Sequence, residues 1–96
     1  TSLVLVGDSA GGNLAVVTAQ ALRERPTAVP VIVQWPIYPV VDKAGDYASF
    51  RDFGDGYLLT VAAMRWFSEA YAAVESDLRN VPLGGRHDDM PATLVL

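Results

Sequence analysis

The residues best suited to chemistry lie near the start of the chain, where Gly7, Asp8, Ser9, Ala10 and Gly11 form the pattern G-x-S-x-G. A serine in this pattern sits at a sharp turn between a buried strand and a helix, with its hydroxyl held clear of both. Small residues are needed on either side because the strand and helix backbones nearly touch there. The pattern predicts that Ser9 is a nucleophile and that the Ala10 backbone N–H stabilises an oxyanion. Asp8 is expected to order neighbouring loops by hydrogen bonding.

The same five residues allow two other interpretations. They can be read as a glycine-rich loop that enters a helix and carries an incidental serine. They can also be read as a phosphate-binding loop, but no Lys-Ser or Lys-Thr pair follows the glycines and the pattern is not G-x-G-x-x-G. The nucleophile is favoured by its context, because its mechanics require a buried strand before the turn and a helix directly after it.

The apolar pattern around Ser9 predicts the elements that must position it. Residues 2–6 form a short apolar run that is typical of a strand buried on both faces of a parallel sheet. Residues 29–35 are a second β-branched run, which Pro36 is expected to end. Between them, residues 10–25 have the period of an amphipathic helix, with an expected apolar stripe of Leu14, Val17, Ala21 and Leu22. Strand, helix and strand together indicate a right-handed crossover unit.

The rest of the chain completes a predicted α/β fold. Residues 36–56 form a long irregular connection whose aromatic content argues against disorder. Thr60 can cap a second helix over residues 61 to about 74, with one face made of Met64, Phe67, Tyr71 and Val74. A loop over residues 75–89 leads to a third apolar run at residues 92–96. We therefore expect about three parallel strands, a crossover helix and a second helix.

Composition excludes several classes of protein. The 96 residues carry a net charge of −4 without a basic stripe, which argues against nucleic acid as a partner. There is no cysteine, so disulfides and a thiol nucleophile are excluded. No stretch of about 18 uncharged apolar residues is present that could span a membrane. The lack of cysteine and of a visible targeting segment favours the cytoplasm.

Residues 7–15, GDSAGGNLA, resemble the nucleophile elbow of the hormone-sensitive-lipase-like branch of the α/β-hydrolases, which holds many microbial carboxylesterases. Three later stretches resemble the same family in the same order along the chain. They are QWPIYPVVD at residues 34–42, FGDGYLLT at residues 53–60 with MRWF at residues 64–67 and Tyr71, and PL at residues 82–83 followed by MPATLV at residues 90–95. The resemblance covers essentially the whole chain.

This resemblance implies a serine carboxylic-ester hydrolase that acts on a small ester through an acyl-enzyme at Ser9, with no cofactor or metal. It also implies that residues 1–96 are an internal fragment, the central part of a single α/β-hydrolase domain. The upstream oxyanion loop and the downstream acid and histidine would then lie outside these residues, and the isolated chain would be inactive. The alternative is a non-catalytic protein that binds a small molecule on the same fold.

The other polar candidates are expected to have structural roles. His87 is the single histidine and lies in a polar loop ahead of the third strand, whereas the base of the resembled family follows that strand. We therefore expect it to be a surface residue. Asp88 and Asp89 are adjacent carboxylates in the same loop and are expected to be solvated rather than to bind a metal. Asp42 and Asp46 are expected to be turn residues.

Aromatic and aliphatic residues of the second half give a candidate substrate pocket. The resemblance places Tyr57, Leu59 and Phe67 in the region that lines the acyl or alcohol pocket of the family. Packing in the protein core is an equally good interpretation of these three side chains. Trp35 and Trp66 are expected to pack.

Overall fold

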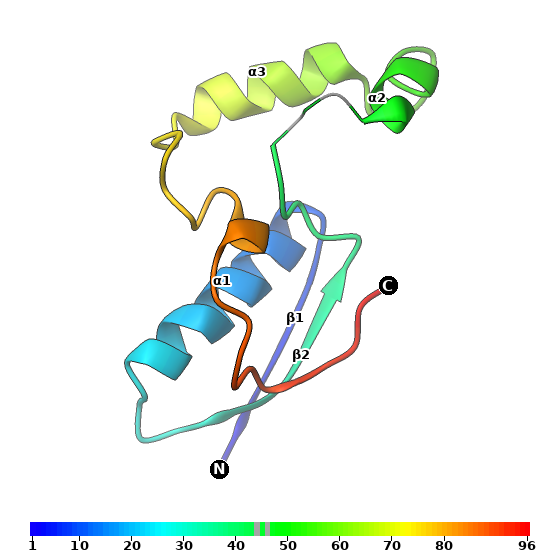
Figure 1. The fold of residues 1–96 in the computed structure, drawn as a ribbon. Coiled ribbons are helices and arrows are strands. Elements are labelled where there is room, and N and C mark those ends of the chain that lie inside the picture. Colours follow the sequence, from blue (N-terminus) through cyan, green and yellow to red (C-terminus); the bar gives the residue numbers. More distant parts are fainter. Residues whose placement is uncertain (44, 46) are drawn as a thin grey trace.

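The computed structural model describes residues 1–43, 45 and 47–96, so the turn expected at Asp46 lies outside the described residues. Its elements, in chain order, are β1 (Leu3–Asp8), α1 (Ala10–Glu24), β2 (Val31–Ile37), α2 (Ala48–Asp52), α3 (Val61–Tyr71), the 3-10 turn η1 (Pro82–Gly84) and β3 (Ala92–Thr93). Figure 1 shows two regions. In one region α1 packs on the sheet that the strands form, and in the other α2 and α3 lie beyond the carboxyl ends of the strands.

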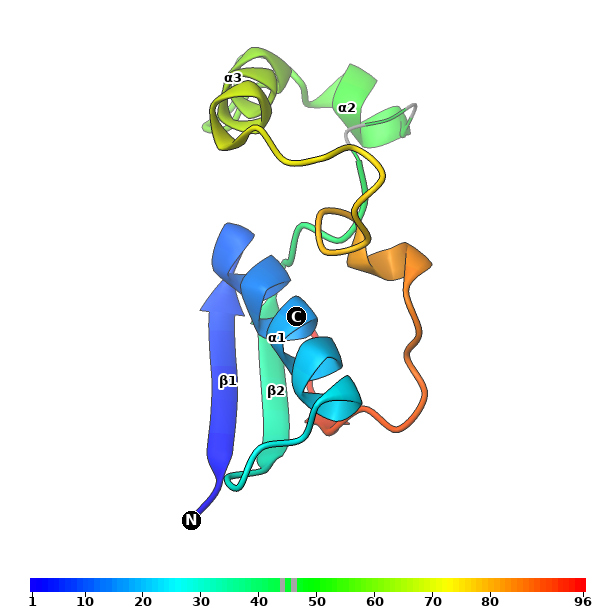
Figure 2. The ribbon, with the colours of Figure 1, turned by 90° about the vertical axis from the view of Figure 1, so that its left-hand side faces the viewer.

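The three strands form one parallel sheet in the order β1-β2-β3. The register of β1 and β2 runs from Leu3 opposite Val31 to Asp8 opposite Ile37, with one irregularity between Leu3 and Val4. Helix α1 connects these two strands and packs on one face of the sheet (Figure 2). The predicted α/β fold with three parallel strands and a crossover helix is confirmed.

Pro36 lies inside β2 and is fully buried, so the expectation that it ends the strand is wrong. Its backbone faces the segment after β3, because its carbonyl accepts the N–H of Leu96 at 3.4 Å. The missing proline N–H therefore removes no bond between β1 and β2. The missing N–H of Pro36 also explains why β3 is shorter than the apolar run at residues 92–96. Beyond the bond from Leu94 N to the Gln34 carbonyl, β2 has no N–H at position 36 to donate to the segment after β3.

The apolar stripe that α1 buries differs from the predicted one. The buried residues are Gly12, Ala15, Val16 and Ala19. In contrast, Leu14 is 54% exposed. Small residues let the helix approach its neighbours closely, since a Cβ on Gly12 would lie 2.9 Å from Pro39 Cα. Both stripes have helical spacing, and only the packing distinguishes them.

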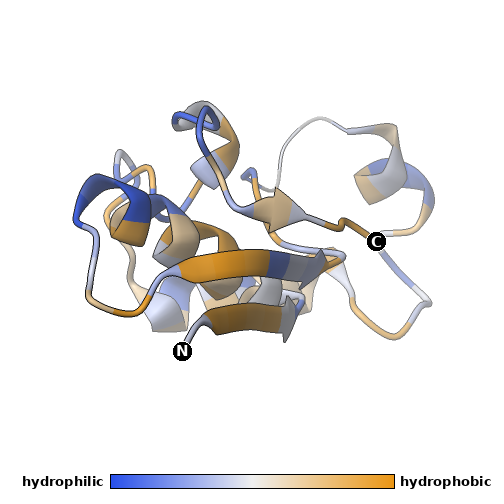
Figure 3. Cartoon of the chain, turned by 90° about the horizontal axis from the view of Figure 1, so that it is seen from below, coloured by the Kyte–Doolittle hydropathy of each residue, from blue (hydrophilic) through white to orange (hydrophobic). Residues whose placement is uncertain are grey.

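The other face of the sheet is apolar and not covered by the described residues. Val4 and Val6 are 55% and 57% exposed, and Val6 is paired with Trp35. The expectation of strands buried on both faces is thus not met within the described part of the chain. Figure 3 shows the apolar character of these strands. None of the helices described is long and apolar enough to cross a membrane.

The segment with α2 and α3 stands apart from the sheet layer. Helix α2 forms inside the connection that was expected to be irregular, and α3 ends at Tyr71 because Ala72 is left-handed, with φ 50°. The predicted cap is confirmed, since Thr60 Oγ1 accepts the N–H of Ala63 at 3.1 Å. No residue of α3 is buried, and Trp66 is 63% exposed, so it is not packed in a core by the described residues, although its ring contacts that of Phe67 edge-on.

Candidate active site

Ser9 is the single residue between the end of β1 and the start of α1. Its backbone has φ 52° and ψ −115°, and such a conformation costs a residue other than glycine about 1–3 kcal/mol. Three hydrogen bonds hold it there. The Ser9 N–H donates to the Ile37 carbonyl at 2.9 Å, and the Ser9 carbonyl accepts from Asn13 N at 3.1 Å and Val40 N at 3.3 Å. The strained turn is therefore fixed by β2, by α1 and by the loop after β2.

The Ser9 hydroxyl is not used to cap the helix that follows it. A serine at this position usually has an extended backbone and accepts an N–H from the first turn. Ser9 makes no such bond, and its Oγ has no hydrogen-bond partner in the described part of the chain. The next residue, Ala10, supplies the first N–H of α1, which has no acceptor within the helix and lies at the positive end of the helix dipole. A hydroxyl that caps no helix and the first amide of α1 are thus adjacent.

The glycines around the turn have different spatial requirements. A Cβ on Gly7 would lie only 2.2 Å from the Gly11 carbonyl oxygen, so β1 and α1 do approach as closely as the pattern predicts. A Cβ on Gly11 would meet nothing nearer than Asp8 Oδ1 at 4.0 Å. Space therefore requires glycine at positions 7 and 12 but not at position 11. The motif itself does not single out Gly12, because its neighbour Pro39 is distant in the sequence.

Asn13 is a supporting residue that the sequence analysis missed. Its Nδ2 donates to the Val40 carbonyl at 2.7 Å and ties the first turn of α1 to the loop after β2. Asn13 makes a bond of the kind expected of Asp8, and the role of Asp8 stays a prediction. In the same loop, Tyr38 has a positive φ of 34° and donates its N–H to the Leu96 carbonyl at 2.7 Å. An asparagine in a first helical turn was the only sequence signal.

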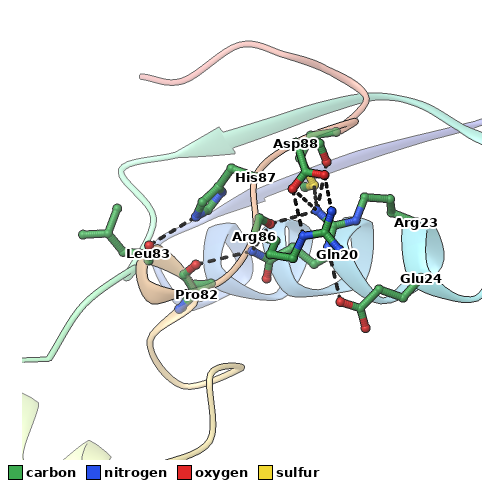
Figure 4. A network of polar contacts seen from close by, with 9 residues as sticks. Gln20, Arg23, Glu24, Pro82, Leu83, Arg86, His87 and Asp88 are labelled. Carbon is green, nitrogen blue, oxygen red and sulfur yellow. Dashed lines mark hydrogen bonds and ion pairs between the residues drawn. The ribbon is translucent and has the colours of Figure 1, made fainter.

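His87 and its neighbours lie in the loop that follows η1 and runs along α1 (Figure 4). His87 is exposed, and its Nε2 lies 3.3 Å from the Leu83 carbonyl rather than near Ser9. Asp88 is ion-paired with Arg86, whose hydrogen bond lowers the pKa of the Asp88 carboxyl. Asp88 is therefore more than a solvated carboxylate. Asp89 is exposed and has a positive φ of 56°.

Three polar contacts lie at the start and end of the segment that carries α2 and α3. Asp42 accepts the N–H of Lys43 at 2.7 Å, as a turn residue does, and also accepts the Tyr47 hydroxyl. The hydrogen bond from Tyr47, followed by that from Lys43, lowers the pKa of the Asp42 carboxyl. Lys43 Nζ contacts Glu75 Oε1 at 2.9 Å, so the two ends of this segment meet.

The three predicted pocket residues lie in the region of α3. Tyr57 is 60%, Leu59 46% and Phe67 56% exposed. Tyr57 packs edge-on against Phe53, and Phe67 packs edge-on against Trp66, with ring centroids 5.5 and 5.2 Å apart. The described residues therefore do not bury these side chains in a core. They belong to the region beyond the sheet end at which the turn of Ser9 lies (Figures 1 and 2), and their role in a pocket stays a prediction.

Known proteins resemble most of this chain. The sequence model of the alpha/beta hydrolase fold family matches residues 1–96. An ethyl acetate hydrolase from Pseudomonas putida is 42% identical over 76 residues, which are 78% of this chain and 24% of the relative. The carboxylic ester hydrolase LipN of Mycobacterium tuberculosis is 41% identical over 71 residues, 68% of this chain and 18% of the relative.

Solved structures show the same similarity. A thermostable esterase from Pseudomonas putida has a TM-score of 0.84 at 31% identity, over 97% of this chain and 31% of that one. An α/β hydrolase enzyme from the metagenome of Lake Arreo has a TM-score of 0.79 at 38% identity, over 95% of this chain and 30% of that one. The chain spans about a quarter of the length of the curated relatives it matches. It belongs to the α/β-hydrolase family, in the hormone-sensitive-lipase-like branch that its sequence motifs indicate.

Proposed function

We propose that residues 1–96 are the central part of a serine carboxylic-ester hydrolase domain that acts through an acyl-enzyme at Ser9. The observation that carries this proposal is the strained backbone of Ser9, with φ 52°, together with a hydroxyl that caps no helix. The substrate class follows from the relatives, which include an ethyl acetate hydrolase and a carboxylic ester hydrolase. Small carboxylic esters are therefore the proposed substrates.

The proposed reaction has two steps. Ser9 Oγ attacks the ester carbonyl carbon, and the oxyanion that forms is stabilised by the Ala10 N–H and the dipole of α1. The alcohol leaves, and the acyl group stays on Ser9 until water releases it as the acid.

A base must take the proton from the Ser9 hydroxyl, since a free hydroxyl is a weak nucleophile. His87 contacts the Leu83 carbonyl instead, so the proposal assigns the base and its acid partner to residues outside 1–96. A second oxyanion donor is assigned to residues outside this range as well. These assignments make the isolated chain incomplete as a catalyst.

The test uses the full-length protein that contains this sequence. Treatment with a fluorophosphonate, followed by peptide mapping, should place the label on Ser9. The Ser9→Ala variant should lose the label and about a millionfold in kcat, the scale seen when a serine nucleophile is removed. Ser49→Ala, a matched change in α2, should keep both. A folded protein that stays unlabelled would contradict the proposal and favour the non-catalytic binding protein.

The isolated chain gives a separate test of its incompleteness. Residues 1–96 alone should hydrolyse p-nitrophenyl acetate no faster than Ser9→Ala in the same chain, because no base reaches the hydroxyl. A fast burst of p-nitrophenol that depends on Ser9 would show that a base lies within these residues.

A further inference from the structure

Residues 37–40, at the end of β2 and just after it, hold the strained backbone of Ser9 on both sides. The Ser9 N–H donates to the Ile37 carbonyl at 2.9 Å, and the Ser9 carbonyl accepts the N–H of Val40 at 3.3 Å. A strained backbone persists only where the surrounding structure holds it in place. The position of residues 37–40 therefore decides whether Ser9 keeps its φ of 52°.

This stretch of chain is itself strained and has few backbone bonds of its own. Tyr38 has a positive φ of 34°, and Pro39 has no N–H to donate. The Tyr38 N–H donates to the Leu96 carbonyl at 2.7 Å, whereas the bond from the Val40 N–H to Ser9 is longer, at 3.3 Å. Backbone bonds thus fix Val40 less firmly than Tyr38, and Val40 needs a further support.

Asn13 supplies that support from the first turn of α1. Its Nδ2 donates to the Val40 carbonyl at 2.7 Å, and its backbone N–H donates to the Ser9 carbonyl at 3.1 Å. Asn13, Val40 and Ser9 are therefore joined in a closed triangle of three hydrogen bonds. The bond from Asn13 Nδ2 is the shortest of the three and the one made by a side chain, so a substitution can remove it while the backbone donors remain.

The same stretch packs directly on α1 beside Asn13. A Cβ on Gly12 would lie 2.9 Å from both Pro39 Cα and Pro39 Cβ, so no side chain fits between the helix and the loop. Asn13 is the next residue along the helix, and its amide fastens the loop at this contact. Each of these contacts joins two residues of the described chain. They therefore do not depend on what else packs at this end of the sheet in a longer protein.

We propose that Asn13 is a positioning residue for the nucleophile Ser9 and acts on it through Val40. The inference rests on the proposed function of Ser9. When the bond from Asn13 Nδ2 is lost, Val40 is released from α1 and the Ser9 carbonyl is held less firmly. The Ser9 hydroxyl then departs from the geometry of attack, and the chemical step slows. Binding of the ester is unchanged, because Asn13 acts on Ser9 and not on the substrate.

The Asn13→Asp variant of the full-length protein tests this. A carboxylate has the size of the amide but can only accept, so it cannot bond to the Val40 carbonyl. Its negative charge is favoured near the N-terminus of α1, which limits the loss of overall stability. We expect kcat and the rate of fluorophosphonate labelling both to fall about tenfold, while KM changes by less than about twofold. The Val40 amide should also exchange its hydrogen faster.

Asn80→Asp is the matched control, since it makes the same change in the loop between α3 and η1. It should leave kcat, KM and the labelling rate as they are in the unmodified protein. If Asn13→Asp does not fold, Asn13→Ala gives the same comparison, because alanine also lacks the donor and is favoured inside a helix.

Two results would overturn the positioning role and leave Ser9 as the nucleophile. One is that Asn13→Asp and the unmodified protein have equal kcat and equal labelling rates, even if the variant unfolds at a lower urea concentration, as a purely structural role would give. The other is a higher KM at constant kcat, which indicates lost substrate binding. If the unmodified protein itself takes no label at Ser9, the proposed function fails, and this inference fails with it.

Discussion

Replacing Gly7 by alanine tests whether the close contact of β1 and α1 fixes the turn of Ser9. The new Cβ would lie 2.2 Å from the Gly11 carbonyl oxygen and 2.3 Å from its carbon, and both are backbone atoms that no rotamer can move. Ordinary contact begins at 3.4 Å, so the strand and the first turn of the helix must separate by about 1 Å. Ser9 lies between these two elements and must move with them.

The size of the effect follows from that displacement. Forcing one methyl group into a packed contact costs about 1–3 kcal/mol, and this contact is tighter than most. A displacement of about 1 Å at a catalytic group costs on the order of a hundredfold in rate. We therefore expect Gly7→Ala in the full-length protein to lower the free energy of unfolding by about 3 kcal/mol and kcat/KM by about a hundredfold.

Gly11→Ala is the matched control for stability. A Cβ at position 11 would lie 4.0 Å from its nearest neighbour, Asp8 Oδ1, and Gly11 is helical without a positive φ. Alanine is favoured over glycine inside a helix by about 0.5–1 kcal/mol, so this variant should be as stable as the parent or slightly more so. Urea unfolding of both variants gives the comparison. If Gly7→Ala and Gly11→Ala unfold at the same urea concentration, the reasoning from the close contact is wrong.

Three further predictions concern the supports of the fold. Thr60→Ala should lower the free energy of unfolding by about 1 kcal/mol through loss of the bond to Ala63 N, and Thr60→Ser should restore most of it in urea titrations. Arg23→Met should speed amide hydrogen exchange in the loop before β3, because Arg23 donates hydrogen bonds to two carbonyls of this loop. Unchanged exchange would show that these two bonds do not hold the loop. Arg79 lowers the pKa of Asp77 to about 2, so the pair should stabilise the fold above pH 3.8 and lose this effect as the pH falls toward 2. NMR titration should show the pKa of Asp77 returning toward 3.8 in Arg79→Gln.

The fold around Ser9 could be predicted because its signals are local. Two apolar runs, a helical period and the G-x-S-x-G pattern lie within 37 residues and agree with one another. The cap at Thr60 is local as well. Which face of α1 is buried could not be predicted from local sequence. Leu14 and Ala15 both lie on stripes of helical spacing, and hydropathy favours the stripe with the larger side chain. Close approach to Pro39 decides it, and that contact is invisible in the sequence.

Some features of the candidate site could likewise be predicted from local sequence, whereas others depend on residues distant in the chain. The interpretation of Ser9 and Ala10 rests on a five-residue pattern, whereas the support from Asn13 depends on a carbonyl 27 residues away. Helix α2 was missed because it has only five residues and no apolar period. The role of Tyr57 and Phe67 depends on which surfaces meet in three dimensions, and neither their type nor their spacing encodes that.

The contact of Lys43 Nζ with Glu75 Oε1, at 2.9 Å, brings together the two ends of the segment that carries α2 and α3. A segment whose two ends lie together can be lengthened, shortened or exchanged without altering the sheet that carries it. The segment with α2 and α3 is therefore suited to exchange between relatives. Swapping it would replace Tyr57 and Phe67 while the backbone of Ser9 kept its own hydrogen bonds, and such exchange is a route by which one scaffold acquires new selectivities.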